Sequence, residues 1–362
     1  MIVNRICSKC VMTESTPGIS FDDEGVCNYC RVHTTPELQP EERLMEILES
    51  SKARDKKYDC MVGLSGGRDS TYTLLKLVRD YRMKALAVTY DNPFMSKQAR
   101  DNIEKALGIL NVDCVTWRFP DDAHRRFTRK HLRIWAKHPS SIMIPFVCAH
   151  CKSWWPEFFK VACDNDISLI VIGSNPLETA SFKKAGLGGA RTYHRVSNLP
   201  KILGRSIKEI MANPRYLTTN WIMVLKMYLG ASHSTPYMKW RYKDIKVVRF
   251  FDYFRWIEKE VESTITRDLG WQKSSEVVSS WRFDCRLDYV RRLMYVSTTG
   301  VTELRDLLSK MIRENQITRE TALERLSKEE SISEHLIEEV LSDLGLRLSD
   351  LNLRFSSSLL VE

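Results

Sequence analysis

Residues 58–81 read YDCMVGLSGGRDSTYTLLKLVRDY, and they constrain the fold most because two periodicities meet there at a glycine pair. Residues 60–64 form a short apolar run, typical of a strand covered on both faces. Apolar residues then recur at helical spacing, so the polar residues 65–70 precede or open a helix, where free N–H groups favour an anion. Gly66 and Gly67 would let the backbone curl around a phosphate. The stretch therefore predicts a phosphate-binding loop, with a capped glycine turn as the alternative.

The loop differs from the common P-loop, which requires a Lys followed by Ser or Thr after its last glycine. The sequence SGGRDS instead resembles the PP-loop of ATP pyrophosphatases, enzymes that split ATP into AMP and pyrophosphate to activate a substrate oxygen. The resemblance implies that the loop holds the pyrophosphate part of ATP, normally together with Mg²⁺. It implies catalytic roles for Asp69, Ser65 and Ser70. The ATP-binding residues that it implies are Ser65, Gly66, Gly67, Arg68, Asp69 and Ser70.

Composition describes a globular chain with room for two or three domains, since 43% of the 362 residues are hydrophobic and 28% are charged. The start of the sequence has no apolar core of a secretory signal, and the most apolar stretch, residues 221–229, is too short to span a membrane. Ten cysteines in such a chain indicate metal binding in a reducing compartment. We therefore expect a cytoplasmic protein without a membrane span.

Positive charge is concentrated between Arg118 and His138, within a net charge of +9. A solvated helix face explains such a run as well as a surface for polyanions does. The polyanion would be ATP, a nucleotide-linked substrate or RNA, and charge alone does not choose among them.

Two CxxC pairs at the N-terminus predict a structural metal site, with a redox CxxC pair as the alternative. Their four cysteines can close a tetrahedral four-thiolate zinc site that leaves no coordination position for a substrate. The region is too short to bury a core of its own, so metal binding would supply its folding energy. The predicted zinc ligands are Cys7, Cys10, Cys27 and Cys30.

The sequence around these pairs resembles the N-acetyl sugar amidotransferase family (WbpG/PseA-like). The segments that carry the resemblance are CSKCVMTESTPGISFDDEGVCNYC, YDCMVGLSGGRDSTYTL and VTYDNPF. The motifs that carry the resemblance lie before about residue 175. The family acts in lipopolysaccharide and flagellin-sugar biosynthesis. The resemblance implies a transferase that forms an amidine from an N-acetyl group with ATP and ammonia.

Further strands are predicted at residues 84–90, 112–117 and 168–172, which with 60–64 indicate an α/β fold with a Rossmann-like parallel sheet. Ligands of such sheets bind beyond the carboxyl ends of the strands. Asp91 and Gly173 follow two of these strands, and we assign both to the ATP pocket. Polar turn formation is the alternative.

The chain divides into four predicted parts. They are a zinc-ribbon module at 1–35, a linker helix at 36–57, the PP-loop ATP-binding catalytic domain at 58–295 with a helical insertion around 200–270, and a helical C-terminal region at 296–362. A glycine cluster at 186–189, beside Lys183, Lys184 and Arg191, is either a mobile loop or a substrate lid.

A second cysteine set consists of Cys148, Cys151 and Cys285. Three thiolates could hold a [4Fe-4S] cluster, or a second zinc with His150 or water as the fourth ligand. Plain structural thiols and redox chemistry are the alternatives. A PP-loop with such a set is similar to tRNA thiolation enzymes. The remaining cysteines, Cys60, Cys114 and Cys163, we interpret as buried apolar side chains.

These features predict an ATP-dependent amidotransferase that adenylates the N-acetyl group of a nucleotide-linked sugar and replaces AMP by ammonia. None of the cysteines lies in a Gly-x-Cys-x-Gly nucleophile turn, and residue 2 is Ile, so no glutaminase is visible in the chain. The resemblance implies a separate HisH-like glutaminase subunit, with a HisF-like barrel to carry ammonia. The alternative is a tRNA sulfur transferase with an iron–sulfur cluster, for which nucleic acid would be the partner. A non-enzymatic zinc-ribbon module is the third hypothesis, and the intact SGGRDS argues against it.

Overall fold

The computed structural model describes residues 5–52, 55–178, 199–218, 235–275, 277–351, 353 and 360–361. The glycine cluster at 186–189 with its neighbouring cations, and the apolar stretch at 221–229, lie outside these residues.

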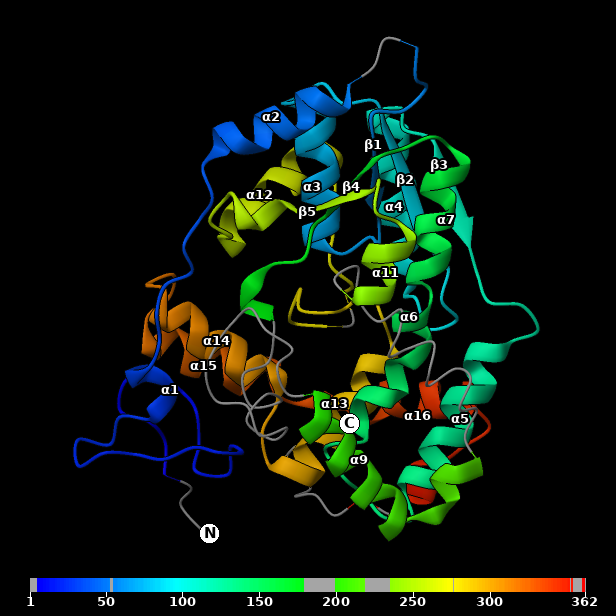
Figure 1. Ribbon diagram of the computed structural model, residues 1–362. Helices are drawn as coiled ribbons and strands as arrows, with labels where there is room; N and C mark the ends of the chain where they lie inside the picture. The colour runs from blue at the N-terminus through cyan, green and yellow to red at the C-terminus, as the bar shows by residue number, and fades with distance from the viewer. Residues whose placement is uncertain are drawn as a thin grey trace.

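A five-stranded parallel sheet with the order β3-β2-β1-β4-β5 forms the centre of the fold (Figure 1). The strands pair in parallel throughout, with Met61 opposite Leu86 in β2 and opposite Ile170 in β4. The predicted α/β class is therefore confirmed. The strands are β1 Cys60–Gly63, β2 Ala85–Tyr90, β3 Cys114–Trp117, β4 Leu169–Ile172 and β5 Lys246–Arg249.

Both faces of the sheet are buried because successive strand residues point to opposite sides. In β1, Cys60 and Val62 join the core formed with α3, α4 and α12, whereas Met61 joins the core formed with α7 and α11. These helices are α3 Arg68–Arg79, α4 Lys97–Leu110, α7 Trp155–Asp164, α11 Pro236–Arg241 and α12 Glu258–Leu269.

A second core lies below the sheet and consists mainly of helices (Figure 1). It joins segments from the middle and the end of the chain, which confirms the predicted helical C-terminal region. Helices α5, α13 and α16 and the 3₁₀ turn η1 carry most of its apolar residues. Their bounds are α5 Ala123–Trp135, η1 Ile144–Cys148, α13 Leu287–Thr299 and α16 Glu334–Asp343.

The remaining elements are short or peripheral. Helix α2 packs Leu44, Ile47 and Leu48 into the main core. The elements are α1 Asn28–Arg31, α2 Glu41–Ser51, α6 Ala149–Ser153, α9 Leu199–Ala212, α14 Glu303–Arg313, α15 Arg319–Glu329, β6 Ile332–Ser333, β7 Leu360–Val361, and the 3₁₀ turns η2 Pro176–Glu178, η3 Pro214–Thr218, η4 Phe250–Asp252 and η5 Leu348–Leu351.

Strand β5 is the main element that the sequence analysis missed. It lies inside the range 200–270, for which a helical insertion was expected, and it pairs with β4 from Leu169 opposite Lys246 to Ile172 opposite Arg249. It reads KVVR, too short and too charged for a recognisable apolar run. The range therefore contributes an edge of the sheet as well as helices.

Two smaller expectations are also resolved. Cys60 is buried and Cys114 is half-buried, but Cys163 is exposed on α7, so the interpretation of Cys163 as a buried apolar side chain was wrong. In the part of the chain that the structure describes, no helix combines the length and apolarity needed to cross a membrane.

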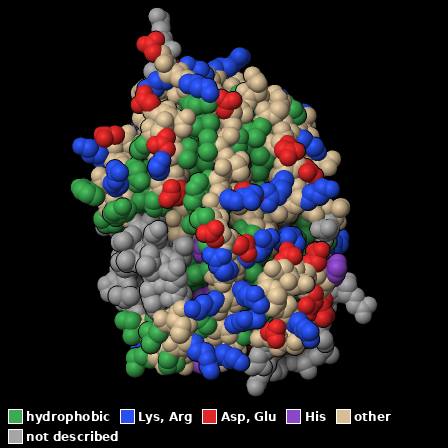
Figure 2. Space-filling view, turned by 90° about the vertical axis from the view of Figure 1, so that its right-hand side faces the viewer, with side chains coloured by type: hydrophobic (Ala, Val, Ile, Leu, Met, Phe, Trp, Pro, Cys, Tyr) green, Lys and Arg blue, Asp and Glu red, His purple; other side chains and the backbone are tan. Residues whose placement is uncertain are grey.

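The basic segment after β3 lies along α5, and Figure 2 shows this side of the molecule with Lys and Arg side chains gathered in its lower half. Arg126, Arg129, Lys130 and Arg133 are exposed, while the opposite face of the helix is buried in the second core. The segment is thus a solvated helix face, and a polyanion surface remains an expectation.

Candidate active site

The SGGRDS loop joins the carboxyl end of β1 to the first turn of α3. Gly67 is the N-cap residue of α3, and no side chain caps the helix. Ser70 stabilises the turn, because its Oγ accepts from the N–H of Ser65 at 3.1 Å and lies 3.2 Å from Ser65 Oγ. The loop occupies the point where the order of the strands reverses, between β1 and β4, which is where open α/β sheets bind ligands.

Two glycines of the site are required by close backbone contacts. Gly66 has φ +76°, and a Cβ there would lie 2.2 Å from the carbonyl oxygen of Ala99 in α4. A Cβ on Gly173, directly after β4, would lie 2.6 Å from the carbonyl oxygen of Asp69. The glycines therefore let α4 and β4 approach the loop closely. The sequence analysis had explained these glycines only by the binding of ATP and its phosphates.

Asp69 is held at both carboxylate oxygens by side chains from distant parts of the chain. Trp256 Nε1 donates to Oδ1 at 2.7 Å, and Asn175 Nδ2 donates to Oδ2 at 2.8 Å. Burial raises the pKa of Asp69, although the Arg68 charge and these hydrogen bonds act in the opposite direction. The carboxylate is thus oriented before any ligand arrives.

Arg68 is buried among carboxylates. Its Nη1 donates to Glu258 at 2.6 Å and to Glu262 at 3.1 Å, and its guanidinium lies 4.9 Å from the centre of the Trp256 ring. These contacts tie α3 to α12. The structure therefore gives Arg68 ion-pair partners within the protein, whereas the sequence analysis expected it to bind ATP.

A cavity of about 550 Å³ opens beside the loop. Its lining includes most of the loop and Gly173, and adds aromatic side chains and several charged groups. The aromatic residues are Tyr90, Trp154, Trp155 and Phe158. The charged residues are Arg68, Asp69, Lys152, Glu178, Arg282, Asp284, Asp288 and Arg291.

Two further carboxyl groups, Glu178 and Asp284, face the loop. Burial, followed by the charge of Asp69, raises the pKa of Glu178 to about 7. Burial also raises the pKa of Asp284, which receives a hydrogen bond from Ser65. Mg²⁺ is commonly held by one or two carboxylates together with substrate phosphates, so Asp69 and Glu178 fit such an ion bound with ATP.

Cys148 and Cys151, and Cys285 from a distant part of the sequence, all line this cavity. Arg291 Nη1 lies 3.7 Å from Cys148 Sγ, and burial raises the pKa of Cys285 to about 12. The three sulfur atoms are not gathered around a single metal ion, since within the described residues only the N-terminal cysteines form a set of three or more ligand atoms within 4.8 Å. The ligands of a [4Fe-4S] cluster bind different iron atoms and lie farther apart than the ligands of one ion, so these three thiols stay candidates for such a cluster.

His150 is not among the residues that line the cavity, which does not support the hypothesis that it is a fourth metal ligand. Its ring stacks on His124 at 4.8 Å and packs edge-on against Phe119 at 4.6 Å. It is buried, and burial lowers its pKa to about 4. His150 is therefore part of an aromatic core beside the cavity.

Asp91 lies in a neighbouring hollow. Its carboxylate forms ion pairs with Arg100 and Arg118. Burial alone would raise the pKa of Asp91, but the hydrogen bonds and charges of the two arginines outweigh it and lower the pKa. The next residue, Asn92, lines the main cavity instead. The assignment of Asp91 to the ATP pocket thus stays a prediction without a contact to support it.

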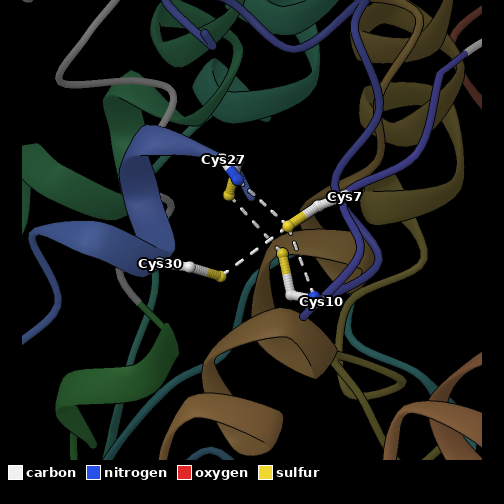
Figure 3. Close-up of side chains that lie close together, drawn as sticks. All are labelled: Cys7, Cys10, Cys27 and Cys30. Carbon is white, nitrogen blue, oxygen red and sulfur yellow. Dashed lines mark hydrogen bonds between the residues drawn. The ribbon is translucent and has the colours of Figure 1, made fainter. Parts of the chain in front are cut away.

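The four N-terminal cysteines converge as predicted, two from the first loop and two from the start of α1 (Figure 3). Cys7 Sγ lies 4.0 Å from Cys30 Sγ, and Cys10 Sγ lies 3.7 Å from Cys27 Sγ. Their ligand atoms all lie within 4.8 Å of one another, and three of the four residues are buried. We call this set the cysteine tetrad; four thiols so placed fit a structural zinc ion.

Sequence reasoning missed several residues of the site. Asn175 and Glu178 follow β4 and carried the signal of polar residues after a strand, and Asp284 directly precedes Cys285. Trp256 carried no signal, because only the tertiary fold brings it to the loop. Lys152 lies next to Cys151 and was overlooked in the same way as Asp284.

No protein-family model matches the chain. The uncharacterized protein MJ1599 of Methanocaldococcus jannaschii is 33% identical over 113 residues, which are 30% of this chain and 41% of that protein. The chain thus spans about two fifths of the length of this curated relative.

Among solved structures, the U34-tRNA thiolase NcsA of Methanococcus maripaludis, with its [4Fe-4S] cluster, is 14% identical and covers 89% of both chains with a TM-score of 0.34. The NMN synthetase of Francisella tularensis is 15% identical and covers 70% of this chain and 96% of that chain, with a TM-score of 0.29. The NH₃-dependent NAD synthetase of Campylobacter jejuni is 14% identical and covers 47% of this chain and 71% of that chain, with a TM-score of 0.28. Similarities at this level carry no argument about function, which rests on the chain's own residues.

Proposed function

We propose that the protein is a PP-loop ATP pyrophosphatase that transfers the AMP part of ATP to an oxygen of a second substrate and releases pyrophosphate. The observation that carries this proposal is the uncapped start of α3 at the strand reversal, with Asp69 pre-oriented by Trp256 and Asn175. Free N–H groups at such a helix start bind phosphate oxygens. Asp69 and Glu178 would hold Mg²⁺, which supplies charge neutralisation at the departing pyrophosphate.

The second substrate in this proposal is a nucleotide-linked N-acetyl sugar. Lys152, Arg282 and Arg291 line the cavity. Arg291 forms ion pairs with Asp288 and Glu303, and Arg282 lies 3.9 Å from Glu303, so Lys152 is the cation that we propose for a phosphate of the substrate. Lys152 Nζ contacts the carbonyl oxygen of Pro145 at 3.4 Å, a weak hydrogen bond that leaves most of its donor capacity for a ligand. The aromatic residues Trp154 and Trp155, which also line the cavity, suit a sugar ring or a base.

The proposed reaction is an amide-to-amidine exchange. The acetamido oxygen attacks the α-phosphorus, the bond from that phosphorus to pyrophosphate breaks, and an adenylated imidate forms. Ammonia then adds to the imidate carbon, and AMP leaves with the former amide oxygen, so that an acetamidino group results. Holding the amide oxygen in line with the phosphorus is the main task of the cavity. A separate HisH-like glutaminase with a HisF-like barrel is the proposed ammonia source.

A second candidate function is sulfur transfer to tRNA after the same adenylation. It is favoured by the three thiols that line the cavity beside the loop. Nitrogen transfer is preferred because the N-terminal motifs resemble the N-acetyl sugar amidotransferase family.

One experiment tests both candidates. The purified protein is incubated with ATP, Mg²⁺ and ammonium, and pyrophosphate release is measured with nucleotide-linked N-acetyl sugars or with bulk tRNA. A sugar whose acetamido oxygen carries ¹⁸O should pass that label to AMP. Release that depends on tRNA and a sulfur donor, with no response to any sugar, would replace the amidotransferase proposal by the thiolation proposal.

A further inference from the structure

One helix end, at residues 310–316, is connected both to Asp69 and to the cysteine tetrad, which lie in different parts of the molecule. We call these residues the α14 bridge, since they comprise the last turn of α14 and the residues that follow it. Figure 1 shows α14 and α15 beside α1 and the N-terminal segment.

The first connection leads from the bridge to Asn175. Lys310 is buried, forms an ion pair with Asp306 at 3.1 Å, and donates from Nζ to the carbonyl oxygen of Leu177 at 3.1 Å. The N–H of Leu177 in turn donates to Asn175 Oδ1 at 2.8 Å, which orients the amide. Asn175 is therefore held in the position from which it donates to Asp69.

The second connection leads from the bridge to Trp256. Gln316 Nε2 donates to the carbonyl oxygen of Trp256 at 2.7 Å, and Arg255 donates to the carbonyl oxygen of Glu314. Trp256 is buried and donates from its ring to the other oxygen of Asp69. Both donors to the Asp69 carboxylate thus depend on the same short segment.

The bridge also contacts the tetrad and its flank. Arg313 lies between the two connections and donates from Nε to Cys30 Sγ at 3.4 Å and from Nη2 to Cys10 Sγ at 3.7 Å. Ile312 packs against the tetrad, and Glu314 pairs with His33 at 2.5 Å. Four thiolates around a divalent ion carry a net negative charge. The electrostatic attraction between the Arg313 guanidinium and the tetrad is therefore complete only when the tetrad binds its metal ion.

We propose that the α14 bridge positions Asp69, with Lys310 and Gln316 as positioning residues, and that the metal-loaded tetrad keeps the bridge in place. The tetrad would then support catalysis although it lies outside the cavity and offers no open coordination position. This inference rests on the proposed function only in the role of Asp69 as the carboxylate that serves pyrophosphate and Mg²⁺.

The first test changes the bridge without touching the tetrad. In Gln316→Met the side chain keeps its approximate size and loses the donor to Trp256. We expect at least a fivefold rise in the Mg²⁺ concentration for half-maximal pyrophosphate release, with zinc content and melting temperature unchanged. Trp256→Phe, which removes the donor to Asp69 itself, should show the larger effect. Gln39→Met is the control, since Gln39 lies in the segment before α2 and is half-buried.

The second test needs no activity. Amide hydrogen exchange is compared between the zinc-loaded protein and Cys7→Ser, and faster exchange is expected at residues 173–178 and 252–257 as well as around the tetrad. Exchange at 85–110, on β2 and α4, should stay the same. The double variant Asp306→Asn/Lys310→Met should accelerate exchange at 173–178 while it retains zinc.

The outcomes separate the two proposals. Exchange changes in Cys7→Ser that stay within residues 5–35 and α14, or a Gln316→Met protein with unaltered Mg²⁺ dependence, would overturn the bridge. A wild-type protein that releases no pyrophosphate with any acceptor would instead remove the proposed function, and the exchange comparison would still decide whether the bridge exists.

Discussion

Asn175 and Asp69 are 106 residues apart in the sequence and joined by one hydrogen bond of 2.8 Å. The bond links the residues after β4 to the first turn of α3, across the reversal of strand order. Its acceptor is a carboxylate whose other oxygen is already bonded to Trp256. The carboxylate is thus oriented by contacts within the protein, so that little reorganisation would be needed for the proposed binding of ATP.

Asp69→Asn should lower the rate of pyrophosphate release at least about 100-fold, because one preorganised electrostatic group is commonly worth that much. The fold should persist, since the amide keeps the shape of the carboxylate. Near-wild-type release by this variant would contradict the assignment of the loop. Asp80→Asn, at the exposed end of α3, is the matched control and should leave the rate unchanged.

Gly66→Ala should destabilise the protein by at least about 2 kcal/mol, because the residue has a positive φ and its Cβ would strike the α4 backbone. Gly108→Ala, in α4 with open space around the new Cβ, should stabilise by about 0.5–1 kcal/mol. Chemical denaturation of the two variants measures both effects. Equal stabilities would show that the loop tolerates a side chain at residue 66.

Cys7→Ser and Cys27→Ser should each lose zinc and lower the melting temperature by several degrees, since metal binding supplies the folding free energy of the N-terminal segment. Zinc is measured by elemental analysis and stability by calorimetry. Cys163→Ser, at an exposed position, should retain zinc and stability. Zinc retained in Cys7→Ser at wild-type stability is incompatible with a four-cysteine site.

The stability of the protein should fall as the pH is lowered from about 6.5 towards 4, in part because of His131. Burial lowers the pKa of His131 to about 4, whereas in the unfolded chain it is near 6.5. A histidine whose pKa is lowered by folding stabilises the folded protein fully only at a pH above its pKa in the unfolded chain. This stability is lost as the pH falls through its pKa in the folded protein. For this residue the loss approaches about 3 kcal/mol.

His131→Gln, which keeps a donor for the carbonyl oxygen of Met143, should therefore make the acid limb shallower. The exposed residue His138 provides the control, and His138→Gln should leave the slope unchanged. Denaturation midpoints measured across this pH range give the comparison. An unaltered slope in His131→Gln would mean that His131 is not the group that titrates.

Protein purified without oxygen should be nearly colourless if it is a nitrogen transferase, because the proposed reaction makes no use of an iron–sulfur cluster at Cys148, Cys151 and Cys285. Visible absorption and iron analysis check this expectation. A brown protein that loses its colour in air would establish an iron–sulfur cluster. If it then acted on tRNA and on no sugar, sulfur transfer would be the function.

The sequence by itself determined the local features of this protein. Residues 60–70 specify a buried strand followed by a polar loop, because apolar runs and glycine pairs act over a few residues. The spacing of the two CxxC pairs predicted the tetrad for the same reason: ligands three residues apart lie on one knuckle of backbone. These features depend on neighbours along the chain.

The tertiary structure decided which residues complete the site. Trp256, Asn175 and Glu178 reach Asp69 only because β1 and β4 are neighbours in the sheet and α12 packs on α3. Strand β5, which reads KVVR, exists because β4 offers it backbone partners. Cys285 joins Cys148 and Cys151 by the same route, through the packing of the second core. Such contacts between distant residues leave no periodicity in the sequence, since their stability comes from the shared burial of separate segments rather than from local preference.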